Sequence, residues 1–172
     1  MNRIAQFEKV SYEQFKKDFD NIFKDHVYSD DEIKGIYDNI KLPERKTTGS
    51  AGYDFHMPLT TVIKSNDVPK LFPTGIRVKI ADGWVLQCYP RSGLGFKHRI
   101  QLDNTVGIID SDYYNSDNEG HILAKLTNDS KGKDSVVIKA GDGFMQGVFV
   151  PYGITYDDEA DGIRNGGFGS TT

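Results

Sequence analysis

The sequence predicts a mostly β protein that begins with a short helical segment. Of its 172 residues, 18 are glycine; seventeen of these lie between positions 49 and 169, whereas the first forty residues contain only Gly35. Aromatic residues make up 12% of the chain. Glycine marks turns, and aromatic side chains are enriched in strands. Many short strands separated by turns favour a sandwich, a jelly roll or a barrel.

The first forty residues are expected to form one strand and two amphipathic helices. Ser11 precedes Gln14 by three positions, which is the spacing of a helix capping box, and Ser29 and Glu32 repeat it. Apolar residues follow each pair at helical intervals. The expected elements are a strand at 3–10 and helices at 12–25 and 30–38. The apolar face most simply docks on the protein's own core, and binding of a partner protein is the alternative.

From residue 41 onward, apolar runs alternate with turn residues, as expected for short strands. The run from Ile76 to Ile80 alternates with a period of two, which is typical of a half-buried strand. Asp82-Gly83 is one of the turn signals between the runs. The predicted strands are 60–64, 71–80, 83–89, 121–126, 135–139 and 144–150. The Gly-rich end, residues 162–172, is expected to be a mobile arm.

Charge and composition argue against several classes of function. The chain has 21 Lys and Arg against 25 Asp and Glu, a net charge of −4, so it is poorly suited to bind a nucleic-acid backbone. The single Cys88 excludes an intrachain disulfide and favours a reducing compartment. No apolar run approaches the roughly 20 residues of a transmembrane helix. We expect a cytoplasmic protein with neither nucleic acid nor membrane as a partner.

Five short stretches carry residue types that suit nucleotide chemistry. Arg91 precedes Ser92-Gly93, so a guanidinium, a hydroxyl and a backbone amide could meet a phosphate, although a surface ion pair is the alternative. Asp110 follows two isoleucines and is a candidate general base against an apolar wall, although a turn aspartate is the alternative. The five stretches are 51–54, 90–95, 104–113, 141–146 and 164–172.

In this order the five stretches resemble the motifs of the trimeric dUTP diphosphatase (dUTPase) family. The resemblance covers roughly residues 41–172, and its most specific part is the run from Pro90 to Tyr113. It implies a jelly-roll subunit, a homotrimer and Mg²⁺-dependent hydrolysis of dUTP to dUMP and pyrophosphate, by in-line attack of water on the α-phosphorus. Such an enzyme limits uracil in DNA and supplies dUMP. The long segment 114–120 resembles dUTPases of Gram-positive bacteria and their phages.

The resemblance also implies a role for each matching residue. Asp110 would activate the water, Tyr113 would pack against the deoxyribose and exclude a 2′-hydroxyl, and Asp54 would hold hydrated Mg²⁺ through water. The residues that would line the uracil pocket, on a β-hairpin, are Asn104, Gly107 and Ile109. Those that would hold the phosphates are Arg91, Ser92, Gly93 and Gln146. From the arm, Arg164 would reach the γ-phosphate and Phe168 would cover the uracil.

The chain departs from the family pattern at several places, and two of them bear most on its function. The fourth motif usually has an arginine where this chain has Gly143, and residues 11–38 look like a helical insertion within a single domain, 1–172. The main alternative function is therefore a regulatory family member that binds a partner protein through residues 11–38. Deamination of dCTP on the same fold ranks lower, because the carboxylate stands in the dUTPase arrangement.

Overall fold

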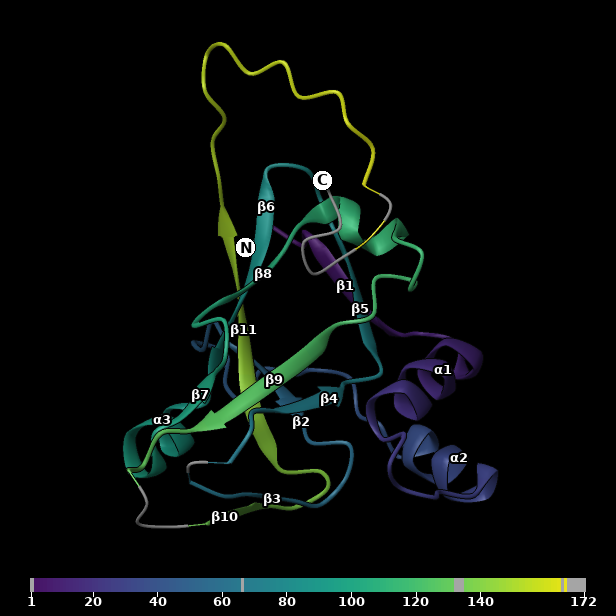
Figure 1. Ribbon diagram of the computed structural model, residues 1–172. Helices are drawn as coiled ribbons and strands as arrows, with labels where there is room; N and C mark the ends of the chain where they lie inside the picture. Colours follow the sequence, from purple (N-terminus) through teal and green to yellow (C-terminus); the bar gives the residue numbers. More distant parts are fainter. Residues whose placement is uncertain (1, 66, 132–134, 165, 167–172) are drawn as a thin grey trace.

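The computed structural model describes residues 2–65, 67–131, 135–164 and 166, and this part of the chain is mostly β-sheet (Figure 1). Its helices are α1 (Tyr12–Ile22), α2 (Asp30–Asp38), α3 (Ser92–His98) and the 3₁₀-helix η1 (Ser111–Asn115). The strands up to position 90 are β1 (Ala5–Lys9), β2 (Tyr53–His56), β3 (Thr61–Ile63), β4 (Lys70–Pro73), β5 (Ile76–Ile80) and β6 (Trp84–Pro90). The later strands are β7 (Ile100–Leu102), β8 (Gly107–Ile109), β9 (Leu123–Asn128), β10 (Val136–Ile138) and β11 (Gly143–Pro151).

The described strands form four antiparallel sheets. The largest has the order β2-β11-β6-β8, and a second has the order β4-β9-β7. Two-stranded sheets join β1 to β5 and β10 to β3. Strand β11 is central, because it pairs with β2 on one side and with β6 on the other. The motif-bearing strands β2, β6, β8 and β11 therefore belong to one sheet.

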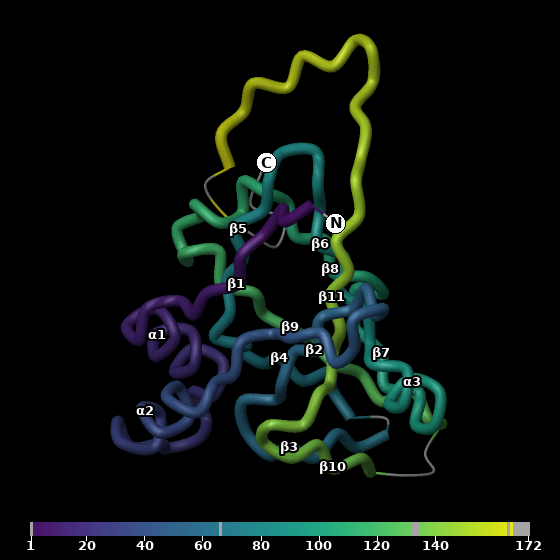
Figure 2. The backbone as a smooth tube through the Cα atoms, turned by 180° about the vertical axis from the view of Figure 1, so that it is seen from behind, coloured from purple at the N-terminus to yellow at the C-terminus, as the bar shows by residue number. Residues whose placement is uncertain are grey.

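The two N-terminal helices lie side by side on one flank of the sheets, as Figures 1 and 2 both show. Phe15 and Phe19 of α1 are fully buried and belong to the same core as Phe55 and Phe144 of the sheet. Burying a side chain of this size stabilises the fold by roughly 1.5–3 kcal/mol. The apolar face of α1 is thus docked on the body, and a partner protein would have to bind another face.

The two helix caps form in different ways. At α2 the Ser29–Glu32 capping box is complete, as predicted. At α1 the Ser11 hydroxyl accepts from the Gln14 amide, but the Gln14 side chain turns away. The backbone N–H of Ser11 donates instead to Glu119, at 2.8 Å. The second half of the predicted box is wrong, because a carboxylate from a distant loop takes its place.

Several predicted boundaries are also corrected. The expected strand 71–80 is two strands, β4 and β5, because Gly75 adopts φ +73 between them. Helix α1 ends at Ile22 rather than at position 25. The residue pattern did not predict strands β2, β7 and β8, since three or four residues are too few to show an alternation of apolar and polar side chains. None of the helices in the described ranges is long and apolar enough to cross a membrane.

Candidate active site

A cavity of about 610 Å³ lies where strands of the two larger sheets approach each other. Its walls are mostly apolar and include Cys88 of β6, Leu102 of β7 and Ala124 of β9. The predicted site residues that line it are Asn104, Gly107, Ile109, Tyr113 and Arg164. A largely apolar pocket with a few polar groups is the usual form of a site for a small organic ligand.

The turn between β7 and β8 forms part of the cavity wall. These strands do not pair with each other, so the expected β-hairpin is wrong: β7 pairs with β9, and β8 pairs with β6. The turn therefore connects the two larger sheets. Gly107 lies opposite Cys88, and a Cβ at Gly107 would come within 3.1 Å of the Cys88 Cβ. Glycine thus lets β8 approach β6 closely.

Asp110 follows β8 directly and precedes η1. Its side chain does not cap that helix; its Oδ2 instead accepts from Arg164 Nη2, at 2.5 Å. Arg164 also places Nε 2.9 Å from Asp112 Oδ1. The candidate base and the arm arginine, 54 positions apart, are therefore brought together within one chain. The other arm residue predicted for the site, Phe168, lies outside the described residues.

Tyr113 is the most buried of the predicted ligand-binding residues at the cavity, with 5% of its surface exposed. Its hydroxyl donates to the carbonyl oxygen of His121, at 2.8 Å. Burial raises the pKa of this phenol above its usual value. The ring is therefore a neutral wall of the cavity, held at its far end by a hydrogen bond.

A second group of predicted residues gathers at the ends of β2, β6 and β11. Asp54 is 8% exposed, and its Oδ2 lies 3.2 Å from Arg91 Nη2. Gln146 stands directly opposite Asp54 on one side and Tyr89 on the other. Ser92 and Gly93 are exposed in the first turn of α3, where backbone N–H groups have no partner within the helix. This group combines a cation, amide donors and one carboxylate.

Gly143 makes room for Arg91. A Cβ at this position would lie 2.7 Å from Arg91 Nη1 and 3.2 Å from its Cζ. The guanidinium of Arg91 thus covers the position where the family pattern has an arginine. The sequence alone shows Gly143 only as a departure from the motif, because the neighbour that fills the space is distant in the sequence.

The cavity and the Arg91–Asp54 group lie on opposite faces of the same sheet. Side chains alternate between faces along a strand. Cys88 and Met145 line the cavity, so Gln146, which follows Met145, points to the other face. Asp54 shares that face with Gln146, because the two are directly paired. A single chain therefore presents the two groups in different directions.

An apolar cavity, a carboxylate beside it and a cationic group on the same sheet define a candidate nucleotide hydrolase. A model of the dUTPase family matches residues 38–172. The chain is 42% identical over 135 residues to a deoxyuridine 5′-triphosphate nucleotidohydrolase of Lactococcus lactis, covering 77% of this chain and 88% of the relative. The Escherichia coli K12 protein of the same name is 38% identical, covering 74% and 85%.

Solved structures agree with these sequence matches. The dUTPase from Streptococcus mutans superposes with a TM-score of 0.60 at 32% identity, covering 87% of this chain and 97% of that one. The dUTPase from phage phi11 of Staphylococcus aureus shares the fold, with a TM-score of 0.62 at 20% identity, covering 94% and 98%. The chain belongs to the dUTPase family, which confirms the resemblance seen in the motifs.

Proposed function

We propose that this chain hydrolyses dUTP to dUMP and pyrophosphate, with Asp110 as the general base. Its family membership establishes the enzyme class, dUTP diphosphatase. The observation that carries the residue assignment is the position of Asp110: it directly follows the β8 strand that lines the cavity, and its carboxylate already holds a cation, Arg164. A substrate in the cavity would bring its phosphates past this carboxylate.

The reaction needs a water molecule directed at the α-phosphorus. Asp110 accepts a proton from that water, the new P–O bond forms, and the bond to the β-phosphate oxygen breaks, so that pyrophosphate leaves. Arg164, Arg91 and the amides of Ser92 and Gly93 supply positive charge and hydrogen bonds for the phosphates. Gln146 adds an amide donor beside Asp54.

Selection of the base would follow from close local contacts in the cavity. Asn104, Gly107 and Ile109 line the cavity at the proposed uracil position, where β8 approaches β6 closely at Gly107 and Cys88. A 5-methyl group, as in thymine, would clash there. Cytosine reverses a donor and an acceptor and would leave buried backbone groups unpaired, which is costly. Tyr113 would close the sugar side against a 2′-hydroxyl.

Asp54 is the residue that fits hydrated Mg²⁺. It offers hard carboxylate oxygens beside the Arg91 guanidinium that would hold phosphate. Mg²⁺ keeps several water ligands and uses few carboxylates, so one such side chain reaching it through water is suitable. When bound, the ion would neutralise phosphate charge.

A homotrimer would allow residues on the two opposite faces of the sheet to contact the same substrate. Asp110 and Tyr113 lie at the cavity, whereas Asp54 and Gln146 point to the opposite face. One substrate can contact both groups if they come from neighbouring chains.

We further propose a single jelly-roll domain over 1–172, since α1 shares its core with the sheets. The arm, 162–172, would then serve as a cover, and the free buried Cys88 suits a cytoplasmic enzyme.

Pyrophosphate release from dUTP, dCTP, dTTP and UTP, each with and without Mg²⁺, tests the proposed reaction. We expect turnover of dUTP in the presence of Mg²⁺ and much weaker turnover of the others. Preferential turnover of dCTP with release of ammonia would favour the deaminase. Absence of dUTP turnover in a folded protein would favour a role in binding a partner through residues 11–38.

Subunit exchange tests the composite site. We would unfold and refold Asp110→Asn together with Arg91→Ala, two variants that are each expected to be nearly inactive. If base and phosphate group come from different chains, about a quarter of sites in a symmetric assembly carry both intact. The control is the same two proteins refolded separately and then mixed. Recovery no greater than in this control, in trimers shown to be mixed, would contradict the composite site.

A further inference from the structure

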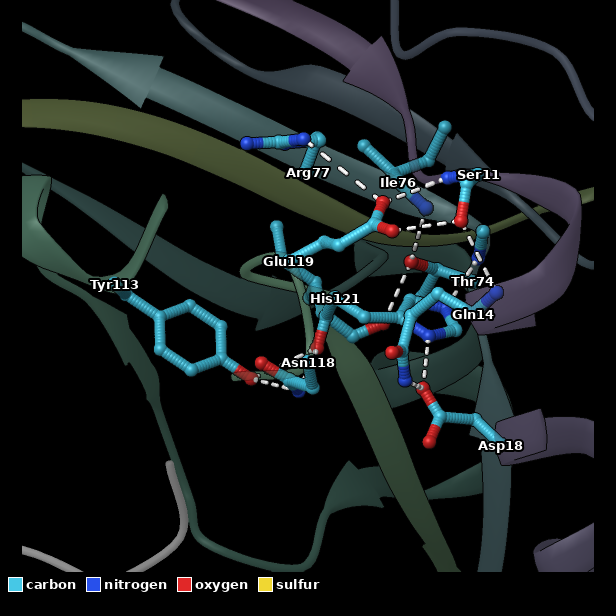
Figure 3. Close-up of polar contacts among 12 residues, drawn as sticks. Ser11, Gln14, Asp18, Thr74, Ile76, Arg77, Tyr113, Asn118, Glu119 and His121 are labelled. Carbon is cyan, nitrogen blue, oxygen red and sulfur yellow. Dashed lines mark hydrogen bonds and ion pairs between the residues drawn. The ribbon is translucent and has the colours of Figure 1, made fainter. Parts of the chain in front are cut away.

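Helix α1 is linked through a buried histidine to Tyr113 (Figure 3), which lines the cavity. His121 is fully buried, and its Nδ1 lies 2.6 Å from Asp18 Oδ2. Its Nε2 accepts from the backbone N–H of Gly75, at 2.8 Å. Because Nε2 is an acceptor, the ring proton is on Nδ1 and is donated to Asp18. The orientation of the His121 ring is therefore determined by Asp18 on one side and by Gly75 on the other.

The Asp18 carboxylate is itself held in place to accept the hydrogen bond from His121. The same Oδ2 that contacts His121 also accepts from Gln14 Nε2, at 2.8 Å, one turn earlier on α1. Burial alone would raise the pKa of Asp18, but the hydrogen bonds from His121 and Gln14 outweigh it and hold the pKa below its usual value. Asp18 is thus an ionised acceptor directed inward from the helix.

The backbone of His121 holds Tyr113. The carbonyl oxygen of His121 accepts from the Tyr113 hydroxyl at 2.8 Å and from Asn118 Nδ2 at 3.3 Å. Asn118 Nδ2 also lies 2.9 Å from the Tyr113 hydroxyl, to which it donates. Figure 3 shows Tyr113 and Asp18 on opposite sides of the His121 loop. A shift of His121 would therefore move the hydrogen-bond partner of the Tyr113 hydroxyl.

The loop between Tyr113 and His121 is too tightly packed to absorb such a shift of His121. Glu119 and Gly120 both have positive φ, and a Cβ at Gly120 would lie 2.7 Å from the Tyr113 carbonyl oxygen. Glu119 is tied to α1 as well, since its carboxylate accepts from the N–H and the hydroxyl of Ser11, at 2.8 and 2.6 Å. The loop is packed against Tyr113 and tethered to α1 at two points.

We propose that Asp18 is a positioning residue for the sugar side of the substrate site, acting through His121 on Tyr113. This inference rests on the proposed role of Tyr113 in excluding a 2′-hydroxyl. Without the Asp18 carboxylate the buried Nδ1–H of His121 loses its acceptor, which is costly, and the ring and loop relax to find another. The Tyr113 ring then packs less closely, and discrimination between deoxyribose and ribose falls.

The ratio of kcat/KM for dUTP to kcat/KM for UTP measures this effect. The ratio is independent of how much of the enzyme is folded, so it separates positioning from a loss of stability. We expect Asp18→Ala to lower it about tenfold. Asp18→Asn should restore most of it, because an amide oxygen can still accept from His121 and Gln14. Asp20→Ala is the matched control: Asp20 is also on α1 but pairs outward with Lys16, and its ratio should equal that of the wild type.

Two further variants separate this inference from the proposed function. If Tyr113→Ala leaves the ratio unchanged, the proposed sugar contact itself is wrong. If Tyr113→Ala lowers the ratio and Asp18→Ala does not, Asp18 contributes only to stability and the inference is overturned.

A double mutant tests the link through the Tyr113 hydroxyl. In a Tyr113→Phe background, which lacks this hydroxyl, Asp18→Ala should lower the ratio little further; full additivity of the two effects would also overturn the inference. If Asp18→Ala does not fold, Gln14→Ala should lower the ratio less but in the same direction, and an unchanged ratio would count against the inference.

Discussion

The strands of the largest sheet and the C-terminal segment hold the residues proposed for the site in contrasting ways. Asp54, Gln146 and Arg91 stand on or next to β2, β11 and β6, whose backbones are paired along their length. Beyond Pro151, residues 152–163 are exposed and loop away from the strands before Arg164 returns to Asp110 (Figures 1 and 2). The strands hold their residues at rigid positions, whereas the long exposed segment allows Arg164 to reach a distant residue, Asp110.

The energies of the two arrangements differ accordingly. The Arg164–Asp110 pair is partly exposed, with 23% and 43% of the two side chains accessible. Pairs of this kind contribute about 1 kcal/mol or less. If Arg164 binds phosphate as proposed, a triphosphate would therefore replace Asp110 as its partner at little cost in free energy. The sheet residues cannot move without breaking a ladder of backbone hydrogen bonds, so they are suited to orient the substrate.

The largest effect is expected where the segment and the cavity meet. Asp110→Asn keeps the shape of the side chain but removes its basicity, so kcat should fall roughly 10²- to 10⁴-fold. The Kd for dUTP should change little, which a binding titration of the inactive variant would measure. Turnover close to that of the wild type would contradict the assignment of Asp110 as the base.

Removal of the guanidinium from the exposed segment should have the next largest effect. Arg164→Ala is expected to lower kcat/KM about 10- to 100-fold, the loss of a charge-assisted contact with phosphate. The free energy of unfolding should change by no more than about 0.5 kcal/mol, because the segment is exposed. Denaturant titration checks the second value. A large loss of stability would show that Arg164 supports the body and would remove the contrast with the sheet.

A smaller effect is expected at the rigid end of the site. Gly143→Ala should displace the flexible end of Arg91 and raise KM for dUTP by about three- to tenfold, with little change in stability. Gly49→Ala is the matched control, since a Cβ there meets nothing within 4 Å. Equal KM values for the two variants would mean that the position of Arg91 over Gly143 is not needed.

The smallest effect is expected when the thiol of Cys88, inside the sheet, is challenged with a thiol reagent. Burial raises the pKa of this thiol to about 12, and only 2% of the residue is exposed. A thiol reagent at pH 8 should therefore not label Cys88 in the folded protein, while chymotrypsin cuts after the fully exposed Tyr156. Labelling of Cys88 as fast as cleavage at Tyr156 would show that the sheet opens as readily as the segment.

Local features could be predicted because their causes are local. The Ser29–Glu32 capping box depends on groups three residues apart, and the structure has it as expected. The motif residues Asn104, Gly107, Ile109 and Tyr113 are close in the sequence, and all four line one cavity. Their roles are proposals, and their grouping at one site is what the resemblance to the family motif implied.

The sequence by itself determined the family and the mostly β class, and its motifs supplied the residues proposed for the site. Only the tertiary structure decided which of these residues face each other. Glu119 replaces the predicted partner of Ser11 from 108 positions away, Arg91 occupies the space over Gly143, and β7 and β8 join different sheets. The link from Asp18 through His121 to Tyr113 is of the same kind. Each depends on which strands and helices pack together, and periodicity within a segment carries no information about the partner across the fold.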